Sequence, residues 1–195
     1  ARKYASMKEQ AKRTDELPEK LFDVMKIMGI DNGLDGALVM LDEGKPVVLL
    51  VMPTVVLKGA KRDHREYVIA DLRYFLNHHH PDHVFIERAH AMPKQGVSSM
   101  FTTGFGFGLM QGLVAGIELP YTVVSAKAWQ GVFFAGMPKG QKREQGYTKV
   151  LASIACSRLW PGTDWRATDA CRKPHDGLCD AALIAEYGRR ALGGV

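Results

Sequence analysis

The chain has 195 residues, of which 46% are hydrophobic and 24% are charged, and its formal net charge is +5. These proportions are typical of a single globular domain, large enough to form a core without a disulfide framework or a structural metal. No run reaches the roughly 18 consecutive apolar residues of a membrane-spanning helix, which argues against a membrane protein.

The 26 Lys and Arg residues exceed the 21 Asp and Glu residues. This excess suits a polyanionic partner, although a merely soluble basic protein explains the charge equally well. Cys156, Cys171 and Cys179 form an odd set without CxxC spacing, so neither a disulfide framework nor a zinc site is indicated. A reducing compartment therefore fits best: the cytoplasm or the nucleoid, for a cellular or a phage-encoded protein, with an organelle as the alternative.

Residues 1–24 are polar and interrupted by Pro18, and we interpret them as an extension that precedes a domain at 25–195. They fit a leader, a remnant or an accessory helix, and we assign them no chemistry. In the domain, apolar runs and turn signals predict strands at 25–31, 37–41, 46–56, 84–86 and 120–124. Residues 58–65 are expected to form a basic loop.

Helical spacing predicts helices from residue 67 to the His-rich stop before Pro81, and then at 105–117, 126–134, 147–159 and about 176–192. The resulting order of elements is β-β-β-α-β-α-β-α-α-α. This order indicates an α/β protein of the ribonuclease-H-like class, with a mixed five-stranded sheet flanked by helices.

Acidic residues stand at the ends of two predicted strands and at the start of the last helix. Asp31 ends the first strand, Glu87 ends the fourth, and Asp176 and Asp180 lie one helical turn apart. A carboxylate at the end of a buried strand is costly unless it is paired, so convergence of these residues would imply a shared cation. The alternative for Asp176 and Asp180 is a pair of solvated acids that stabilise the N-terminus of their helix.

Four carboxylates are a sufficient ligand set for metal-dependent phosphodiester hydrolysis. Two divalent ions about 4 Å apart can generate the attacking hydroxide, stabilise the phosphorane and support the leaving oxygen. Mg²⁺ takes oxygen ligands and needs few carboxylates, because it keeps waters and binds substrate phosphate. The residues thus indicate a site with two Mg²⁺ ions, for which Mn²⁺ is expected to substitute.

Three segments resemble one known family. Residues 27–37, Ile-Met-Gly-Ile-Asp-Asn-Gly-Leu-Asp-Gly-Ala, resemble the first motif of RuvC-type Holliday junction resolvases. Residues 84–87 resemble their second acidic strand, and 175–185 resemble their C-terminal acidic helix. Residues 92–96 and 104–109, together with the spacing of four between the last two acids, are similar to the phage and chloroplast branch. Asn32 stands where many members have proline.

The resemblance implies a crossover junction endonuclease, a homodimer that binds a four-way DNA junction and nicks two opposed strands symmetrically. Asp31, Glu87, Asp176 and Asp180 would hold the metal ions. His175 and Lys173, which flank the last acids, would stabilise the transition state or assist proton transfer, with His175 favoured. Asp35 is interpreted first as a turn residue.

Residues expected to contact DNA fall into three basic or polar segments, although each could equally be a solvated surface residue. The segments contain Lys58, Lys61, Arg62 and Arg65; Lys94, Gln95, Ser98 and Ser99; and Lys139, Lys142 and Arg143. We favour 94–99, predicted as a loop, because it follows Glu87 and precedes a glycine-rich helix. For Phe101, Phe105 and Phe107, core packing is preferred over a wedge in the junction.

Two other functions stay open. The first hairpin carries an Asp-x-Gly turn, Asp31-Asn32-Gly33, of the kind that also occurs in sugar-kinase and actin-like ATPases, but those need two such domains and a second phosphate loop. A junction-binding protein without catalysis is the other alternative, and the presence of all four acids argues against it. The histidines at 78–80 and 83 are interpreted as solvated rather than metal-binding, and Cys179 as a small core residue.

Overall fold

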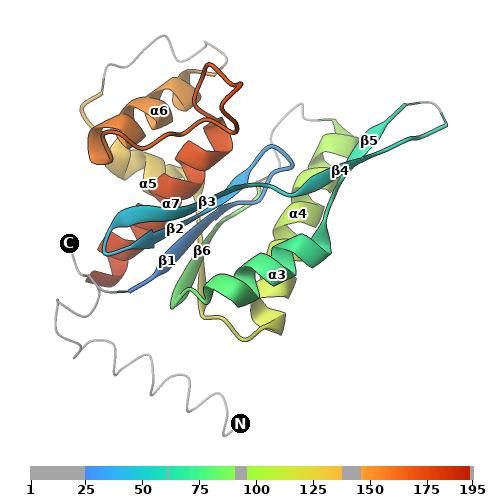
Figure 1. Ribbon diagram of the computed structural model, residues 1–195, viewed down its shortest axis with the longest axis horizontal. Coiled ribbons are helices and arrows are strands. Elements are labelled where there is room, and N and C mark those ends of the chain that lie inside the picture. The colour runs from blue at the N-terminus through green and yellow to red at the C-terminus, as the bar shows by residue number, and fades with distance from the viewer. Residues whose placement is uncertain (1–24, 61, 91–95, 138–145, 194–195) are drawn as a thin grey trace, which may run out of the picture.

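A five-stranded mixed sheet forms the centre of the computed structural model, which describes residues 25–60, 62–90, 96–137 and 146–193 (Figure 1). The strand order is β3-β2-β1-β6-β7. Strands β1 (Ile27–Asp31), β2 (Ala37–Asp42) and β3 (Lys45–Val51) form an antiparallel meander. Strands β6 (His83–Glu87) and β7 (Tyr121–Val124) continue the sheet parallel to β1. The predicted mixed five-stranded sheet is confirmed.

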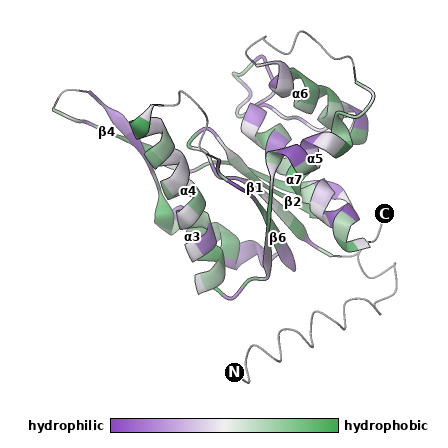
Figure 2. Cartoon of the chain, turned by 180° about the vertical axis from the view of Figure 1, so that it is seen from behind, coloured by the Kyte–Doolittle hydropathy of each residue, from purple (hydrophilic) through white to green (hydrophobic). Residues whose placement is uncertain are grey.

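Helices cover both faces of this sheet. Helices α3 (Ile69–His79) and α4 (Val97–Gly116) lie on one side, and α5 (Ala126–Phe133), α6 (Tyr147–Leu159) and α7 (Asp176–Gly193) lie on the other, as Figures 1 and 2 show from opposite directions. In the described segments no helix is long and apolar enough to cross a membrane, even the 20-residue α4.

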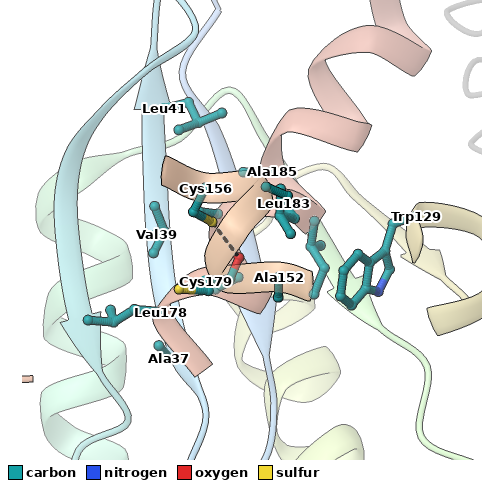
Figure 3. Packing of buried hydrophobic residues seen from close by; sticks show 14 of the residues in the cluster. Ala37, Val39, Leu41, Trp129, Ala152, Cys156, Leu178, Cys179, Leu183 and Ala185 are labelled. Atoms are coloured by element: carbon teal, nitrogen blue, oxygen red, sulfur yellow. Dashed lines mark hydrogen bonds between the residues drawn. The ribbon is translucent and has the colours of Figure 1, made fainter. Parts of the chain in front are cut away.

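The strands bury both faces, so the sheet separates two hydrophobic clusters. Successive side chains of a strand point to opposite faces. Accordingly, Met28 and Ile30 of β1 pack with α3 and α4, whereas Ile27 packs with Phe85 on the side of α7. The α7 side includes Cys179, which is fully buried as predicted and whose carbonyl oxygen lies 3.4 Å from the sulfur of Cys156 in α6 (Figure 3).

The predicted strand 46–56 is wrong, because it is divided between two sheets. Strand β3 ends at Val51, and the next residue donates its N–H to the carbonyl oxygen of Gly36 at 3.0 Å. Pro53 follows, and its lack of an N–H group ends the ladder. Strand β4 (Thr54–Leu57) then pairs with β5 (His64–Tyr67) in a separate two-stranded sheet, so part of the predicted loop 58–65 is also strand. We call residues 54–67 the β4–β5 arm, which extends away from the sheet past α4 (Figure 1).

Helix α4 begins at Val97, eight residues before the predicted start at residue 105. Gly96 is its N-terminal cap residue, in an extended conformation, and Gly104 lies inside the helix. The low helix propensity of glycine therefore gave the wrong boundary, since tertiary packing overrides propensity. Ser98 and Ser99 consequently lie in the first turn of a helix and not in a loop. The other predicted helices agree with the structure within two residues.

Candidate active site

Asp31 and Glu87 end two neighbouring parallel strands. The register pairs Ile30 with Ile86, so the two acids that follow lie next to each other at the same edge of the sheet. Each shares the strand face of a residue that packs toward α7, Ile27 in β1 and Phe85 in β6. Both acidic side chains are partly buried. The pleat of the strands thus directs the two carboxylates to the side of the sheet that α7 covers.

Helix α7 brings the remaining two acids to the same place. Its second residue, Gly177, abuts the turn after β1, where an added Cβ would come within 2.6 Å of the carbonyl oxygen of Asp35. Asp176 and Asp180 lie one turn apart on this helix end, beside the turn that follows Asp31. Three segments distant in sequence therefore converge, as the strand-end acids predicted.

Asp31, Glu87 and Asp180 resist ionisation. Burial raises the pKa of Glu87 to about 7, and the negative charge of Asp31 adds to this effect. Burial likewise raises the pKa of Asp180 to about 8, with further contributions from Asp31, Glu87 and Asp176. The pKa of Asp31 is also raised, mainly by burial, against a hydrogen bond from the N–H of Gly33. Among the described residues, the positive charge near these three carboxylates does not offset their burial and mutual repulsion.

Two side chains from α5 and α6 donate hydrogen bonds to carboxylate oxygens of the site. The indole Nε1 of Trp129 in α5 donates a hydrogen bond to Glu87 Oε1 at 3.2 Å. Lys149 Nζ in α6 lies 2.6 Å from Asp176 Oδ2, and this bond raises the pKa of the lysine. Sequence reasoning missed both residues. A single lysine in a helix carries no sequence signal that distinguishes a site residue from a surface residue.

The chemistry of the donors fits a hard divalent cation. All four converging residues offer carboxylate oxygens, the ligands that Mg²⁺ and Mn²⁺ prefer. Among the described residues, however, no three Asp, Glu, His or Cys side chains are already arranged around one ion position. The bonds of Lys149 to Asp176 and of Trp129 to Glu87 explain part of this, because each draws a carboxylate toward another partner. Binding of a cation would require these side chains to turn.

The turn after β1 connects the ends of the two acidic strands. The side-chain amide of Asn32, a buried residue, donates a hydrogen bond to the carbonyl oxygen of Glu87. Asp35 lies in this turn, as expected, and accepts a hydrogen bond from Arg65. Arg65, which the sequence predicts as a DNA contact, uses its guanidinium group within the protein. Asn32 therefore ties the Asp31 and Glu87 strand ends together.

His175 and Lys173 lie just before α7. His175 Nδ1 accepts a hydrogen bond from the N–H of Leu178 at 3.3 Å, so the ring caps the helix N-terminus. With Nδ1 engaged as an acceptor, Nε2 is the atom that can carry the proton of the neutral ring. Lys173 is exposed and lines an open hollow of about 430 Å³ together with Cys171 and His175. Their catalytic roles stay predictions.

Only some of the residues that we expect to contact DNA lie in the described segments. Lys58 and Arg62 are exposed on the loop of the β4–β5 arm, and Ser98 and Ser99 are exposed on the first turn of α4. Six residues of that set lie outside the described residues: Lys61, Lys94, Gln95, Lys139, Lys142 and Arg143.

The preference for core packing of the phenylalanines is wrong for two of the three. Phe101 is 74% exposed and Phe105 is 49% exposed, whereas Phe107 is half-buried and packs on the cluster under α3 and α4. Residues four apart share a helix face, and the buried face of α4 carries Met110 and Val114. Phe101 and Phe105 lie on another flank of the helix and stack on each other there.

Comparison with solved structures identifies the fold. RuvC of Thermus thermophilus, in complex with a Holliday junction substrate, is 16% identical over 88% of this chain and 97% of that chain, with a TM-score of 0.52. A second structure of Thermus thermophilus RuvC gives 17% identity over 87% and 97%, with a TM-score of 0.49. The yeast mitochondrial Holliday junction resolvase Ydc2 gives 11% over 88% and 81%, with a TM-score of 0.47. No family model and no curated protein matches the chain. The similarity to the RuvC complex confirms the predicted ribonuclease-H-like fold.

Proposed function

We propose that this protein is a divalent-metal-dependent endonuclease that resolves four-way DNA junctions. The observation that carries the proposal is the convergence of Asp31, Glu87, Asp176 and Asp180 at the edge of the sheet. The pKa values of Asp31, Glu87 and Asp180 are raised there. Such a cost in electrostatic energy is expected where a functional cation compensates it. RuvC, which has the same fold, was solved with a Holliday junction substrate.

The residues of the site have distinct tasks in this proposal. Asp31, Glu87, Asp176 and Asp180 would hold two Mg²⁺ ions, which when bound supply a hydroxide nucleophile and stabilise the charge of the phosphorane. Lys149 places an ammonium group beside the carboxylates, where it can attract the scissile phosphate. His175 can donate or accept a proton at Nε2, and Lys173 offers a further positive charge at the rim.

The surface outside the site suits branched DNA. Because the four acids are gathered in one place, the rest of the chain is more basic than its net charge of +5. Lys58 and Arg62 are exposed on the loop of the β4–β5 arm, which extends away from the sheet (Figure 1), and there they can contact phosphates of an arm of the junction. The protein would then recognise the junction mainly by the shape of the DNA and the charge of its phosphate backbone.

Helix α4 supports a homodimer. It has 20 residues and no charged side chain, yet Val97, Phe101 and Phe105 are largely exposed. Glycines at 104, 108, 112 and 116 recur every four residues, and an added Cβ at any of them would meet no atom within 4 Å. A solvent-facing helix normally carries charges on that face. A second copy of the chain would cover this surface and would match the two-fold symmetry of a four-way junction.

A cleavage assay tests the proposed function. The purified protein is incubated with a synthetic mobile four-way junction and Mg²⁺, and the products are mapped on each strand. We expect paired nicks in opposed strands, their loss on addition of EDTA, and their loss in Asp31→Asn. A linear duplex of the same sequence is the substrate control and should stay uncut. Junction affinity should also fall steeply as salt increases, because phosphate contacts release counterions.

Two other outcomes would replace this proposal. Tight binding of junctions of several sequences without a cut, in Mg²⁺ and in Mn²⁺, would identify a junction-binding protein that lacks catalysis. Turnover of ATP without nuclease activity would favour the ATPase alternative.

A further inference from the structure

We infer that Arg65 and Tyr67 of the β4–β5 arm are positioning residues for the acidic site, so that the arm couples DNA contact to the arrangement of Asp31 and Glu87. This inference rests on the proposed nuclease function. It extends that function, because it assigns a role to two residues outside the metal-binding set.

Arg65 joins the arm to the turn that follows Asp31. Its guanidinium Nη1 donates to Asp35 Oδ1, and Nη2 donates to the carbonyl oxygen of Leu34 at 2.7 Å. The same Nη2 donates to Thr54 Oγ1 on the neighbouring strand of the arm at 2.9 Å. The planar fork of an arginine can satisfy several acceptors in fixed directions, which a lysine cannot. Arg65 therefore fixes two consecutive residues of the turn relative to the arm.

Tyr67 holds the other side of the same turn. Its hydroxyl donates a hydrogen bond to the carbonyl oxygen of Asn32 at 2.9 Å, and the residue is buried. Gly106 of α4 makes room for this bond, because a Cβ there would overlap the tyrosine hydroxyl and lie 2.5 Å from the Asn32 oxygen. Burial and the charge of Asp31 raise the pKa of Tyr67 to about 12, so the hydroxyl stays a donor.

The turn held in this way controls both strand-end carboxylates. Asn32, whose carbonyl oxygen binds Tyr67, also donates from its side chain to the carbonyl oxygen of Glu87. Gly33 donates its N–H to Asp31 Oδ1 at 3.1 Å. A displacement of the turn would therefore move Asp31 directly and Glu87 through Asn32. Small displacements of ligand oxygens are enough to lower the rate of a positioned reaction.

The Arg65–Asp35 ion pair is open to solvent, so its loss should affect the position of the turn and not the stability of the fold. The Arg65 side chain is 37% exposed and that of Asp35 is 89% exposed. Ion pairs so open to solvent contribute little to the free energy of unfolding. Loss of the Arg65 contacts should thus leave the fold intact while it loosens the turn. Arg62 lies three residues earlier, on the loop of the arm, and is exposed. A substitution of Arg62 is therefore a control that tests DNA contact alone.

The experiment compares Arg65→Gln, Arg65→Lys and Tyr67→Phe with Arg62→Gln and with Arg73→Gln on the exposed face of α3. Junction cleavage gives kcat and KM separately, and amide hydrogen exchange of residues 33–36 is followed in the metal-free protein, independently of cleavage. We expect the first three variants to lower kcat about ten-fold, with KM within about two-fold, and to speed exchange in the turn several-fold. Arg62→Gln should raise KM only, and Arg73→Gln should change neither.

Other results would overturn the inference. Arg65→Gln could raise KM as Arg62→Gln does and leave kcat and the amide hydrogen exchange of residues 33–36 unchanged. In that case Arg65 is a DNA contact and not a positioning residue. Full recovery of kcat in Arg65→Lys would show that its charge alone matters. If the wild type cleaves no junction, the proposed function fails, whereas unchanged exchange in the variants is what defeats the positioning role. The two failures are therefore distinguishable.

Discussion

Gly29 of strand β1 lies directly against the backbone of Ala181 in helix α7. A Cβ at residue 29 would overlap the carbonyl oxygen of Ala181 and would lie 2.5 Å from the N–H nitrogen of Ala185. Asp31 follows two residues later on the same face of β1, and Asp180 directly precedes Ala181. The absence of a side chain at Gly29 thus sets how closely the two acidic residues approach.

Replacement of Gly29 by alanine should destabilise the protein and separate these acids. The added methyl group meets backbone atoms that cannot rotate away, so we expect a loss of about 2 kcal/mol in the free energy of unfolding. Chemical denaturation measures this loss. Gly131→Ala in α5 is the matched control, because a Cβ there meets no atom within 4 Å. This variant should stabilise the protein by about 0.5–1 kcal/mol. Equal effects of the two variants would contradict the close contact between β1 and α7.

Asp180→Asn should have opposite effects on activity and stability. Burial and three neighbouring acids raise the pKa of Asp180 to about 8, so its ionised form is costly in the metal-free protein. Asparagine removes that charge at nearly constant volume, and the melting temperature without metal at pH 9 should rise. Junction cleavage should fall on the order of 100- to 1,000-fold. Asp71→Asn, at an exposed position in α3, serves as control, and a lower melting temperature for Asp180→Asn would oppose this account.

The sequence predicted the parts of the site that follow from local patterns. Asp31 and Glu87 directly follow buried apolar runs, and the parity of the strands places both on the α7 side. The four-residue spacing put Asp176 and Asp180 on adjacent turns of one helix. These relationships need only the periods of a strand and a helix together with the order of elements.

Residues that act through tertiary placement could not be predicted in the same way. Lys149 meets Asp176 across 27 positions, and Tyr67 meets Asn32 across 35. Neither pair follows from a period or a motif. The β4–β5 arm was also missed, since β4 continues the apolar run of β3 after Pro53 and β5 is polar and charged. The exposure of Phe101 and Phe105 could not be predicted either. Their aromatic side chains favour burial, but the orientation of α4 determines which of its residues are buried.

The stability of the metal-free protein should decrease as pH rises. Folding raises the pKa of Glu87 from 4.5 to about 7 and that of Asp180 from 3.8 to about 8. The folded state then binds protons more tightly than the unfolded chain, so this contribution is fully present below pH 4 and is lost as pH passes through 7 to 8. Mg²⁺ binds the deprotonated carboxylates and should raise the melting temperature more at pH 8 than at pH 5.

Calorimetric scans between pH 5 and pH 9, with and without Mg²⁺, check this linkage. The double variant with Glu87→Gln and Asp180→Asn cannot titrate at these positions. Its melting temperature should vary less with pH than that of the wild type, and it should respond weakly to the metal. Identical pH profiles of wild type and double variant would show that these two carboxylates titrate normally.

Lys149→Met should free Asp176 and thereby separate metal binding from catalysis. The ammonium group now holds Asp176 Oδ2 at 2.6 Å, in competition with a cation. Its removal should lower the Mg²⁺ concentration needed for half-maximal thermal stabilisation. Cleavage at saturating Mg²⁺ should nevertheless fall about 100-fold, because the positive charge near the phosphate is lost. Lys127→Met on the exposed side of α5 is the control, and unchanged cleavage by Lys149→Met would restrict the lysine to a structural role.

Gly112→Lys should dissociate the proposed dimer. The residue lies on the exposed glycine face of α4, where a Cβ meets no atom of the same chain. Lysine also favours helix more than glycine does, so the substitution should leave the isolated chain folded. A charge at the centre of an apolar interface has no partner and should prevent association. Sedimentation velocity should then show a monomer, whereas Tyr74→Lys on the exposed side of α3 should stay dimeric.

Loss of the dimer should also change how a junction is cut. A monomer of Gly112→Lys keeps its four acids, so it should still nick, but without the coupling that places the second nick in the opposed strand before the junction dissociates. A supercoiled plasmid with an extruded cruciform distinguishes these cases, because paired nicks give linear DNA and single nicks give open circles. Linear product from a monomeric Gly112→Lys, at the wild-type rate, would show that α4 is not the surface through which two copies cooperate.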